Sequence, residues 1–259
     1  MKRALLAAYV TSLRLLRDAG WVSGLVLLLA YALKRAYSAA GADALAWVLA
    51  PSCFVAHQLS GLELLHEVGA GFISHEARMV VGPACAGVNF LIVGWLALYF
   101  TLQARLSSTR HKLVWLLGAF VCAYVATVVT NGLRISLAAL LYQAELPVWL
   151  TPARAHRLLG VVLYCSMLYG LCRGAELCSG LGVEAPPSGA GLRPGPLAWY
   201  GVYAVVVVGI PLANCALQRD PARFAEHALS SLGVAALVLL GWNWLGQRMV
   251  RLCWRGPGT

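Results

Sequence analysis

The sequence has few charged residues for its length. Only 12% of its 259 residues are charged, whereas an ordinary soluble domain carries about 25%. Hydrophobic residues make up 60% of the chain, and polar groups cannot cover that much apolar surface in water. A transmembrane helix needs about 20 mostly apolar residues. The composition therefore excludes a soluble globular protein and predicts a membrane protein with no room for a sizeable soluble domain.

Acidic residues are scarcer still, with 10 Asp and Glu against 20 Lys and Arg. The chain nevertheless lacks a basic stripe interleaved with aromatic residues, which excludes nucleic acid as its partner. Many basic residues lie beside apolar segments instead, as in cytoplasmic loops that follow the positive-inside rule. This pattern predicts the lipid bilayer as the surroundings of the chain, and it is clearest at Lys34, Arg35, Arg105, Arg110, Lys112, Arg248, Arg251 and Arg255.

Metal-binding and disulfide patterns are also missing. The eight cysteines form no CxxC pair and most of them lie in apolar stretches, where cysteine usually acts as a small hydrophobic residue. His66-Glu67 and His75-Glu76 do not form an HExxH motif, and their spacing does not suit a zinc pair on one helix. We therefore expect no metal site and no cofactor, and we predict that residues 62–78 form a solvated outer loop.

What the sequence has is a series of apolar segments, and these predict an all-α, polytopic transmembrane helix bundle with about eight spans. The organisation expected is a set of N-terminal membrane segments at 1–35, a membrane core at 36–178, a flexible cytoplasmic linker at 179–196, and a C-terminal transmembrane hairpin with a basic cytoplasmic tail at 197–259. The two shortest apolar segments are 4–16 and 21–33, and the others lie near 44–62, 86–104, 113–134, 157–172, 197–217 and 229–246.

The basic loops predict how the bundle is oriented. If the basic segment 105–112 is cytoplasmic, alternation of the spans puts 34–43 and 173–196 on the same side. The outward-facing segments are then 63–85 and 135–156, together with 218–228.

Cys85 is the first candidate functional residue. Gly82 and Pro83 mark a helix start, which predicts Cys85 in the first turn of a helix at the outer surface. A helix N-terminus favours the thiolate, which is the nucleophilic form. Asn89 follows four residues later and would share a face with Cys85. The alternative is a packed cysteine among small residues that allow helices to approach closely.

Arg134 is the second candidate, at the end of a long apolar run that begins at residue 113. Thr127, Asn131 and Arg134 share one helical face. An arginine within a span usually faces the interior and has a function. The alternative is an interfacial arginine that extends to the membrane surface.

His156 is the third candidate, where the next apolar span begins, and histidine suits proton transfer near neutral pH. Its alternative is a plain interfacial residue. Together, Cys85, Arg134 and His156 are predicted at the outer ends of three different spans, where they would form an acyl-transfer site. The thiolate would attack a peptide carbonyl, the arginine would stabilise the oxyanion, and the histidine would carry the proton. Asn89 and Asn131 would support these residues.

Three short motifs in this order resemble the exosortase/archaeosortase family, over about residues 44–175. They are Cys85-Ala86-Gly87, Asn131-x-x-Arg134-Ile135, and His156 with Gly160 four residues on. The stretch 83–91 looks most like the short exosortase K subfamily. One departure is Ala86, where many members carry serine, although another small residue should serve there.

The resemblance implies a cysteine endopeptidase or transpeptidase, a hydrolase of the bacterial inner membrane with its active site at the outer, periplasmic face. It implies that Cys85, Arg134 and His156 cleave PEP-CTERM-type sorting signals through a thioester acyl-enzyme. The implied partners are exported proteins with a C-terminal motif, a transmembrane helix and a basic tail. The alternative function is a non-catalytic membrane transporter or scaffold that uses Arg134 to contact anions or lipid headgroups.

Overall fold

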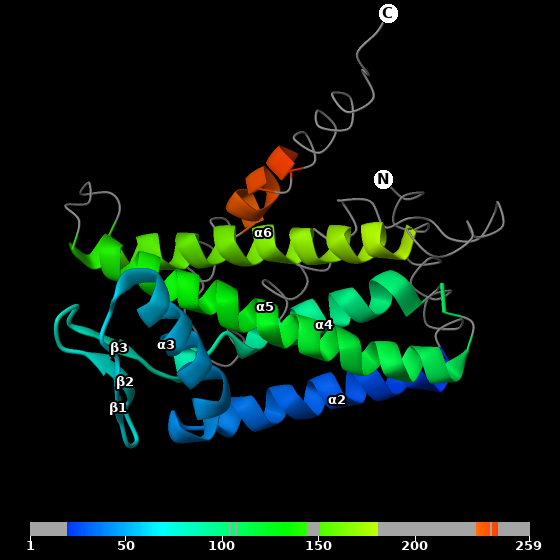
Figure 1. The fold of residues 1–259 in the computed structure, drawn as a ribbon, viewed down its shortest axis with the longest axis horizontal. Helices are drawn as coiled ribbons and strands as arrows, with labels where there is room; N and C mark the ends of the chain where they lie inside the picture. The colour runs from blue at the N-terminus through cyan, green and yellow to red at the C-terminus, as the bar shows by residue number, and fades with distance from the viewer. Residues whose placement is uncertain are drawn as a thin grey trace, which may run out of the picture.

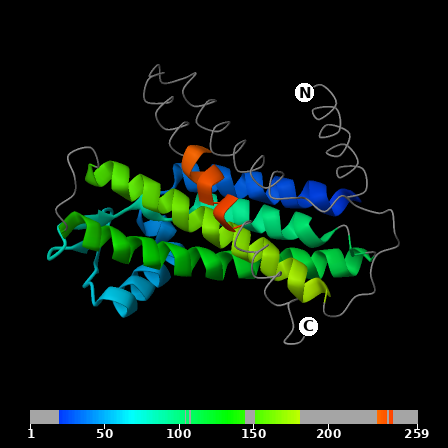
Figure 2. The same cartoon turned by 90° about the horizontal axis from the view of Figure 1, so that it is seen from above.

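Long helices dominate the computed structural model, which describes residues 20–103, 105–106, 108–143, 151–180, 232–238 and 240–242. Helix α5 (Thr109–Gln143) is the longest and packs against α3 (Ala46–Ser60), α4 (Val88–Gln103) and α6 (Pro152–Gly180). Helix α2 (Gly20–Ala39) packs mainly on α4. Figures 1 and 2 show α2, α4, α5 and α6 lying alongside one another as a bundle.

Four of these helices are long and apolar enough to cross a membrane, by length and composition. They cover Trp21–Ala39, Pro83–Gln103, Thr109–Tyr142 and Arg154–Cys178. The chain is therefore mostly helical and has the character of a membrane protein. Of the other predicted spans, 4–16 and 197–217 lie outside the described residues, and part of 229–246 is helical at 232–238 and 240–242.

The predicted span at 44–62 is wrong. Helix α3 has 15 residues and is therefore about 22 Å long, too short for a hydrocarbon core of about 30 Å. It begins after a 3₁₀ turn, η1 (Asp43–Leu45), and ends at Ser60, beyond which the N–H of Gly61 donates to the carbonyl of His57. Its buried side lies against α5, so its apolar residues serve packing between helices.

Because α3 does not cross the bundle, the sidedness predicted for residues 34–43 is also wrong. The end of α2 lies beside the start of α4, where Lys34 Nζ donates to Asn89 Oδ1 at 2.8 Å. Tyr37 donates to the carbonyl of Pro83 nearby, at 3.3 Å. Residues 34–43 therefore share one end of the bundle with Cys85, and the basic segment 105–112 lies at the other end (Figure 1).

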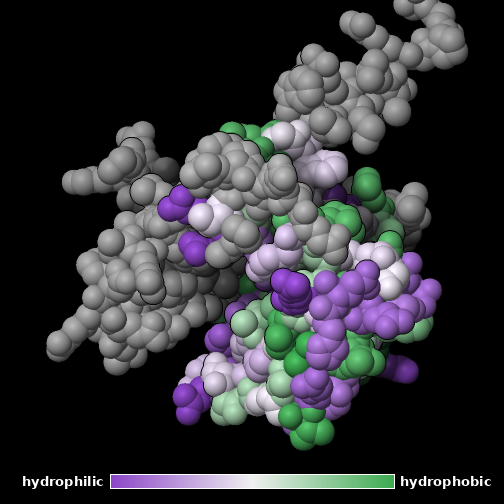
Figure 3. All heavy atoms as spheres, turned by 90° about the vertical axis from the view of Figure 1, so that its left-hand side faces the viewer, coloured by the Kyte–Doolittle hydropathy of each residue, from purple (hydrophilic) through white to green (hydrophobic). Residues whose placement is uncertain are grey.

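The segment predicted as a loop at 62–78 forms a small sheet, so the all-α prediction holds only for the long elements. Strands β1 (Leu65–Glu67), β2 (Gly71–Ser74) and β3 (Met79–Val81) pair antiparallel in the order β1-β2-β3. Leu65 pairs with Ile73, and Ile73 with Val80. Figure 3 looks onto this end of the molecule and shows many hydrophilic residues across it, interrupted by hydrophobic ones.

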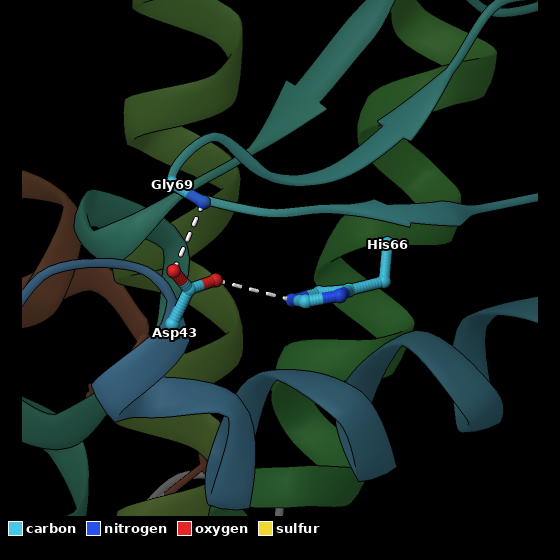
Figure 4. Close-up of polar contacts among 3 residues, drawn as sticks. All are labelled: Asp43, His66 and Gly69. Carbon is cyan, nitrogen blue, oxygen red and sulfur yellow. Dashed lines mark hydrogen bonds and ion pairs between the residues drawn. The ribbon is translucent and has the colours of Figure 1, made fainter.

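Asp43 attaches this sheet to the corner between α2 and α3. Its Oδ2 accepts a hydrogen bond from the Gly69 N–H at 2.9 Å, and its Oδ1 lies 3.3 Å from His66 Nε2 (Figure 4). The sheet is thereby held over the end of the bundle, and β3 leads through Gly82 directly into the turn that carries Cys85.

Two tryptophans join α4 to α5 along the middle of the bundle. Trp95 Nε1 donates to the carbonyl of Leu116 at 3.0 Å, and Trp115 Nε1 donates to the carbonyl of Leu98 at 3.1 Å. A buried indole N–H needs such a partner. These reciprocal bonds fix how α4 lies along α5, and so fix where the Cys85 turn meets α5.

Candidate active site

Cys85 lies in a 3₁₀ turn, η2 (Pro83–Cys85), that precedes α4. The prediction that placed it in the first turn of the helix is therefore wrong by a few residues. The Cys85 N–H donates to the carbonyl of Gly82 at 2.9 Å, and the side chain is partly buried against the apolar cluster that contains Cys53 and Val88. Because Cys85 is outside α4, it does not share a helix face with Asn89, which instead accepts the bond from Lys34.

Gly87 brings the Cys85 turn close to α5 and α6. Its φ is +71°, in the left-handed region that favours glycine. A Cβ at this position would lie 3.3 Å from both Thr127 Cγ2 and Tyr164 Oη, and 3.4 Å from Asn131 Cγ. Any other residue here would have a strained backbone and a Cβ in close contact with α5 and α6. Glycine therefore lets the turn that carries the thiol approach both helices.

Arg134 projects from α5 toward α6. Its Nη2 lies 2.6 Å from His156 Nε2, and its Nη1 donates to Tyr164 Oη at 3.1 Å. The side chain lies over Gly160, where a Cβ would come within 3.2 Å of Arg134 Nε. Arg134 is well inside α5, which continues to Gln143, and this corrects the prediction that Arg134 ends its span.

His156 lies near the start of α6, as predicted, and faces Arg134. A guanidinium can only donate hydrogen bonds, so His156 Nε2 is the acceptor and the neutral ring carries its proton on Nδ1. His156 Nδ1 and Arg134 Nε are both buried with no hydrogen-bond partner among the described residues. Two N–H donors are thus available for an acceptor at this point between α5 and α6.

Asn131 connects this pair of residues to the Cys85 turn. Its side chain is completely buried, its Nδ2 donates to the Cys85 carbonyl at 2.6 Å, and its Oδ1 accepts from Tyr164 Oη at 3.1 Å. A continuous set of hydrogen bonds therefore runs from His156 through Arg134, Tyr164 and Asn131 to the backbone of Cys85.

Helix α2 adds two polar side chains to the same end of the bundle. Lys34 Nζ also lies 5.1 Å from the centre of the Tyr37 ring. Tyr37 is close enough to Cys85, Tyr164 and Arg134 to interact with all three electrostatically. The Cys85 and Arg134 side chains therefore both lie near Tyr37 of α2.

Cys53 on α3 is a second thiol in this region, and it is chemically different from Cys85. Burial, together with the nearby Cys85, raises the pKa of Cys53 to about 12. Only 4% of Cys53 is exposed. Since the thiolate is the reactive form, Cys53 is an inert packing residue at neutral pH.

Comparisons of the chain with protein-family models, with curated proteins and with solved structures give no match. Among the described residues, no three His, Cys, Asp or Glu side chains are grouped so that they could hold a metal ion. The side chains that meet are a guanidinium, an imidazole, a phenol and an amide, and the amide bonds to the backbone of the residue that carries the thiol. These groups suit nucleophilic attack on a carbonyl and proton transfer.

Tyr164, Lys34 and Tyr37 were not predicted as site residues from the sequence. A signal for Tyr164 was present, because His156, Gly160 and Tyr164 follow one another at intervals of four on the same face of α6. Lys34 carried no such signal: its partner Asn89 is distant in the sequence, and the predicted topology placed the two at opposite ends of the bundle.

Proposed function

We propose that the protein is a membrane cysteine endopeptidase or transpeptidase that cleaves C-terminal sorting signals of exported proteins. The observation that carries this proposal is the direct contact between Arg134 and His156, together with the hydrogen bonds through Tyr164 and Asn131 to Cys85. Three short motifs from distant parts of the sequence thus meet at one end of the bundle. They are the same motifs that resemble the exosortases.

The reaction begins when the Cys85 thiolate attacks the carbonyl carbon of the scissile peptide bond. A C–S bond forms, and the carbonyl electron pair moves to oxygen, where the Arg134 guanidinium stabilises the negative charge. The C–N bond then breaks and its electron pair goes to nitrogen, which takes up the thiol proton. The amine leaves with the transmembrane helix and basic tail of the substrate, and Cys85 holds the acyl group as a thioester.

His156 carries the proton between thiol and leaving amine. In the resting arrangement its Nε2 accepts from Arg134, so the ring nitrogen that must receive a proton is occupied. We propose that the carbonyl oxygen of the bound substrate draws Arg134 away from His156, which frees Nε2 to accept the thiol proton before the thiolate attacks. Water or an acceptor amine then attacks the thioester and gives a proton to His156, the C–S bond breaks, and His156 passes that proton to the released thiolate of Cys85.

The proposed location is the bacterial inner membrane, with the sheet and Cys85 at the outer face. The segment between α4 and α5 has three basic residues and no acidic one over 103–112, as expected on the cytoplasmic side. The opposite end carries most of the acidic residues of the described chain, namely Asp43, Glu63, Glu67 and Glu76. This orientation puts the thiol level with a cleavage motif just outside the membrane, next to the transmembrane helix of a substrate.

The test is processing of an exported reporter that carries a C-terminal sorting tail from the same genome. Wild type should shorten the reporter, whereas Cys85→Ser, Arg134→Ala and His156→Ala should leave it intact at equal membrane levels. Cys122→Ser is the matched control, because Cys122 lies on α5 with its side chain exposed.

The transporter or scaffold alternative makes the opposite prediction for the thiol. A protein that uses Arg134 only to contact anions or lipid headgroups should tolerate Cys85→Ser without any loss of function. Continued reporter processing by the Cys85→Ser variant would therefore rule out the proposed mechanism.

A further inference from the structure

We propose that Tyr164 is a positioning residue that holds the Arg134 guanidinium toward Cys85. This inference rests on the proposed function, and it adds a residue that the three motifs do not contain. Tyr164 lies on α6 between the arginine of α5 and the turn that carries the thiol, and its hydroxyl contacts groups on both sides.

The hydroxyl of Tyr164 makes two hydrogen bonds with opposite roles. It accepts from Arg134 Nη1 at 3.1 Å and donates to Asn131 Oδ1, also at 3.1 Å. Because Asn131 in turn donates to the Cys85 carbonyl at 2.6 Å, one phenol couples the position of the guanidinium to that of the thiol-bearing backbone. A phenylalanine would leave Arg134 Nη1 and Asn131 Oδ1 without this partner.

Packing fixes the ring itself independently of the hydroxyl. The Tyr164 ring is stacked on Phe90 of α4, with centroids 4.7 Å apart and planes 12° apart. Arg134 Cζ lies 5.6 Å from the centre of the same ring. Gly87 keeps the space beside the hydroxyl open, since a Cβ there would lie 3.3 Å from Tyr164 Oη. A phenylalanine should therefore keep the ring in place and remove only the two hydrogen bonds.

The consequence is that Tyr164 affects chemistry at Cys85 through Arg134. Arg134 also contacts His156 through a hydrogen bond, the Tyr164 ring through its guanidinium carbon, and Gly160 by close packing. None of these three contacts is a hydrogen bond that leads to the Cys85 turn. Without the hydroxyl, the guanidinium is free to turn toward His156 alone. Its positive charge would then act less strongly on the thiol and on an oxyanion formed there.

The experiment compares the electrostatic potential at the Cys85 thiol between variants, and it needs no peptide substrate. The other seven cysteines are replaced by alanine, and the full chain in membranes is reacted with an anionic and with a neutral methanethiosulfonate. In both reactions the thiolate attacks the sulfenyl sulfur and a sulfinate leaves, so the ratio of the two rates cancels general changes in access. Tyr164→Phe is compared with Tyr169→Phe, which makes the same change on the same helix, next to Trp242 instead of Arg134.

We expect Tyr164→Phe to lower the ratio of anionic to neutral rates by about threefold or more, as the loss of one charge-assisted hydrogen bond implies. Tyr169→Phe should leave the ratio unchanged. In an Arg134→Gln background, where the ratio is already low, Tyr164→Phe should have no further effect. Because no reporter is involved, this result is independent of whether the protein proves to be a peptidase.

Two results would overturn the inference. One is an unchanged ratio in Tyr164→Phe when Arg134→Gln lowers it, because the arginine would then be positioned without the phenol. The other is an equal effect of Tyr164→Phe with and without Arg134, because the phenol would then act on Cys85 by another route.

Discussion

At the scale of single residues, the site depends on glycines that leave room for large neighbouring side chains. Arg134 lies across Gly160, which is buried on α6. Gly87 plays the same part beside Tyr164 and Asn131. Both glycines belong to the short motifs that contain Cys85 and His156, and the structure gives a physical reason for each of them.

Gly160→Ala should reduce processing about tenfold or more, because its Cβ would lie 3.2 Å from Arg134 Nε and push the guanidinium out of place. Gly170→Ala on the same helix is the control, since a Cβ there meets nothing within 4 Å. Reporter processing and membrane levels of both variants are the measurements. Equal activity of the two variants would show that the position of Arg134 over Gly160 does not matter.

Cys53 should be unreactive toward iodoacetamide at pH 8 in the folded protein, while Cys85 is alkylated. Burial raises the pKa of Cys53 to about 12, so its thiolate is scarce at every pH well below that value. Mass spectrometry of alkylated peptides, with a sample denatured in detergent as the control, measures both sites. Alkylation of Cys53 at the rate of Cys85 would show that α3 opens readily or packs differently.

The sequence predicts the three main residues of the site, but it does not predict all of their contacts. Cysteine and histidine each occur in a short motif near the start of an apolar segment, arginine occurs in one within α5, and Arg134 and His156 do meet in the structure. The hydrogen bonds of Asn131 to the Cys85 carbonyl and to Tyr164 were not predictable. They depend on how α5, α6 and the Cys85 turn pack together, which no local pattern encodes.

At the scale of elements, α3 is the helix that the hydropathy pattern wrongly predicts to be a membrane span. The apolar run from 44 to 62 is long enough for a span, but the helix occupies only Ala46–Ser60. An apolar segment also results when a short helix is buried against a longer one, as α3 is against α5. The sheet at 65–81 was missed for a different reason, because its strands have only three or four residues each.

Gly132→Ala should destabilise the protein by about 1–3 kcal/mol, the usual cost of overpacking. Its Cβ would lie 2.6 Å from Val55 Cγ1 and 2.9 Å from the Ser52 carbonyl oxygen, so α3 would have to move away from α5. Gly118→Ala, also on α5, meets only Trp115 at an ordinary 3.8 Å and should be neutral or stabilising. Thermal unfolding of the purified variants in one detergent compares them.

Val55→Ala should restore only part of the stability of Gly132→Ala, because it removes the Cγ1 atom but leaves the Cβ of residue 55, at 2.7 Å, and the Ser52 carbonyl in place. A Gly132→Ala variant as stable as wild type would contradict the close packing of α3 on α5. That packing matters for the site, since Gly132 lies between Asn131 and Arg134 in the sequence.

At the scale of the whole molecule, composition was enough to predict a helical membrane protein. Four helices of spanning length and apolar character agree with it. Topology was harder, because one misread helix reverses the side of every segment that precedes it. Treating α3 as a span put residues 34–43 at the cytoplasmic end, and the bond from Lys34 to Asn89 puts them at the end that holds Cys85.

Single cysteines in a cysteine-free background test this arrangement. A membrane-impermeant maleimide added to intact cells should label Gly41→Cys and Val68→Cys, and should label Ser108→Cys only after the membrane is opened. Val68 is 88% exposed in the turn of the sheet, and a Cβ at Gly41 meets nothing within 4 Å. Labelling of Gly41→Cys and Val68→Cys from opposite sides would mean that α3 does cross the membrane.

The central claim is that Cys85 carries the substrate as a thioester, and capture of that intermediate tests it most directly. The tailed reporter is processed by purified protein in the presence of hydroxylamine, and its new C-terminus is identified by mass spectrometry. We expect a hydroxamate with wild type, formed when hydroxylamine attacks the thioester, and no cleavage with Cys85→Ser. A reporter cut only to a free carboxylate in abundant hydroxylamine, or cut by Cys85→Ser, would contradict the account.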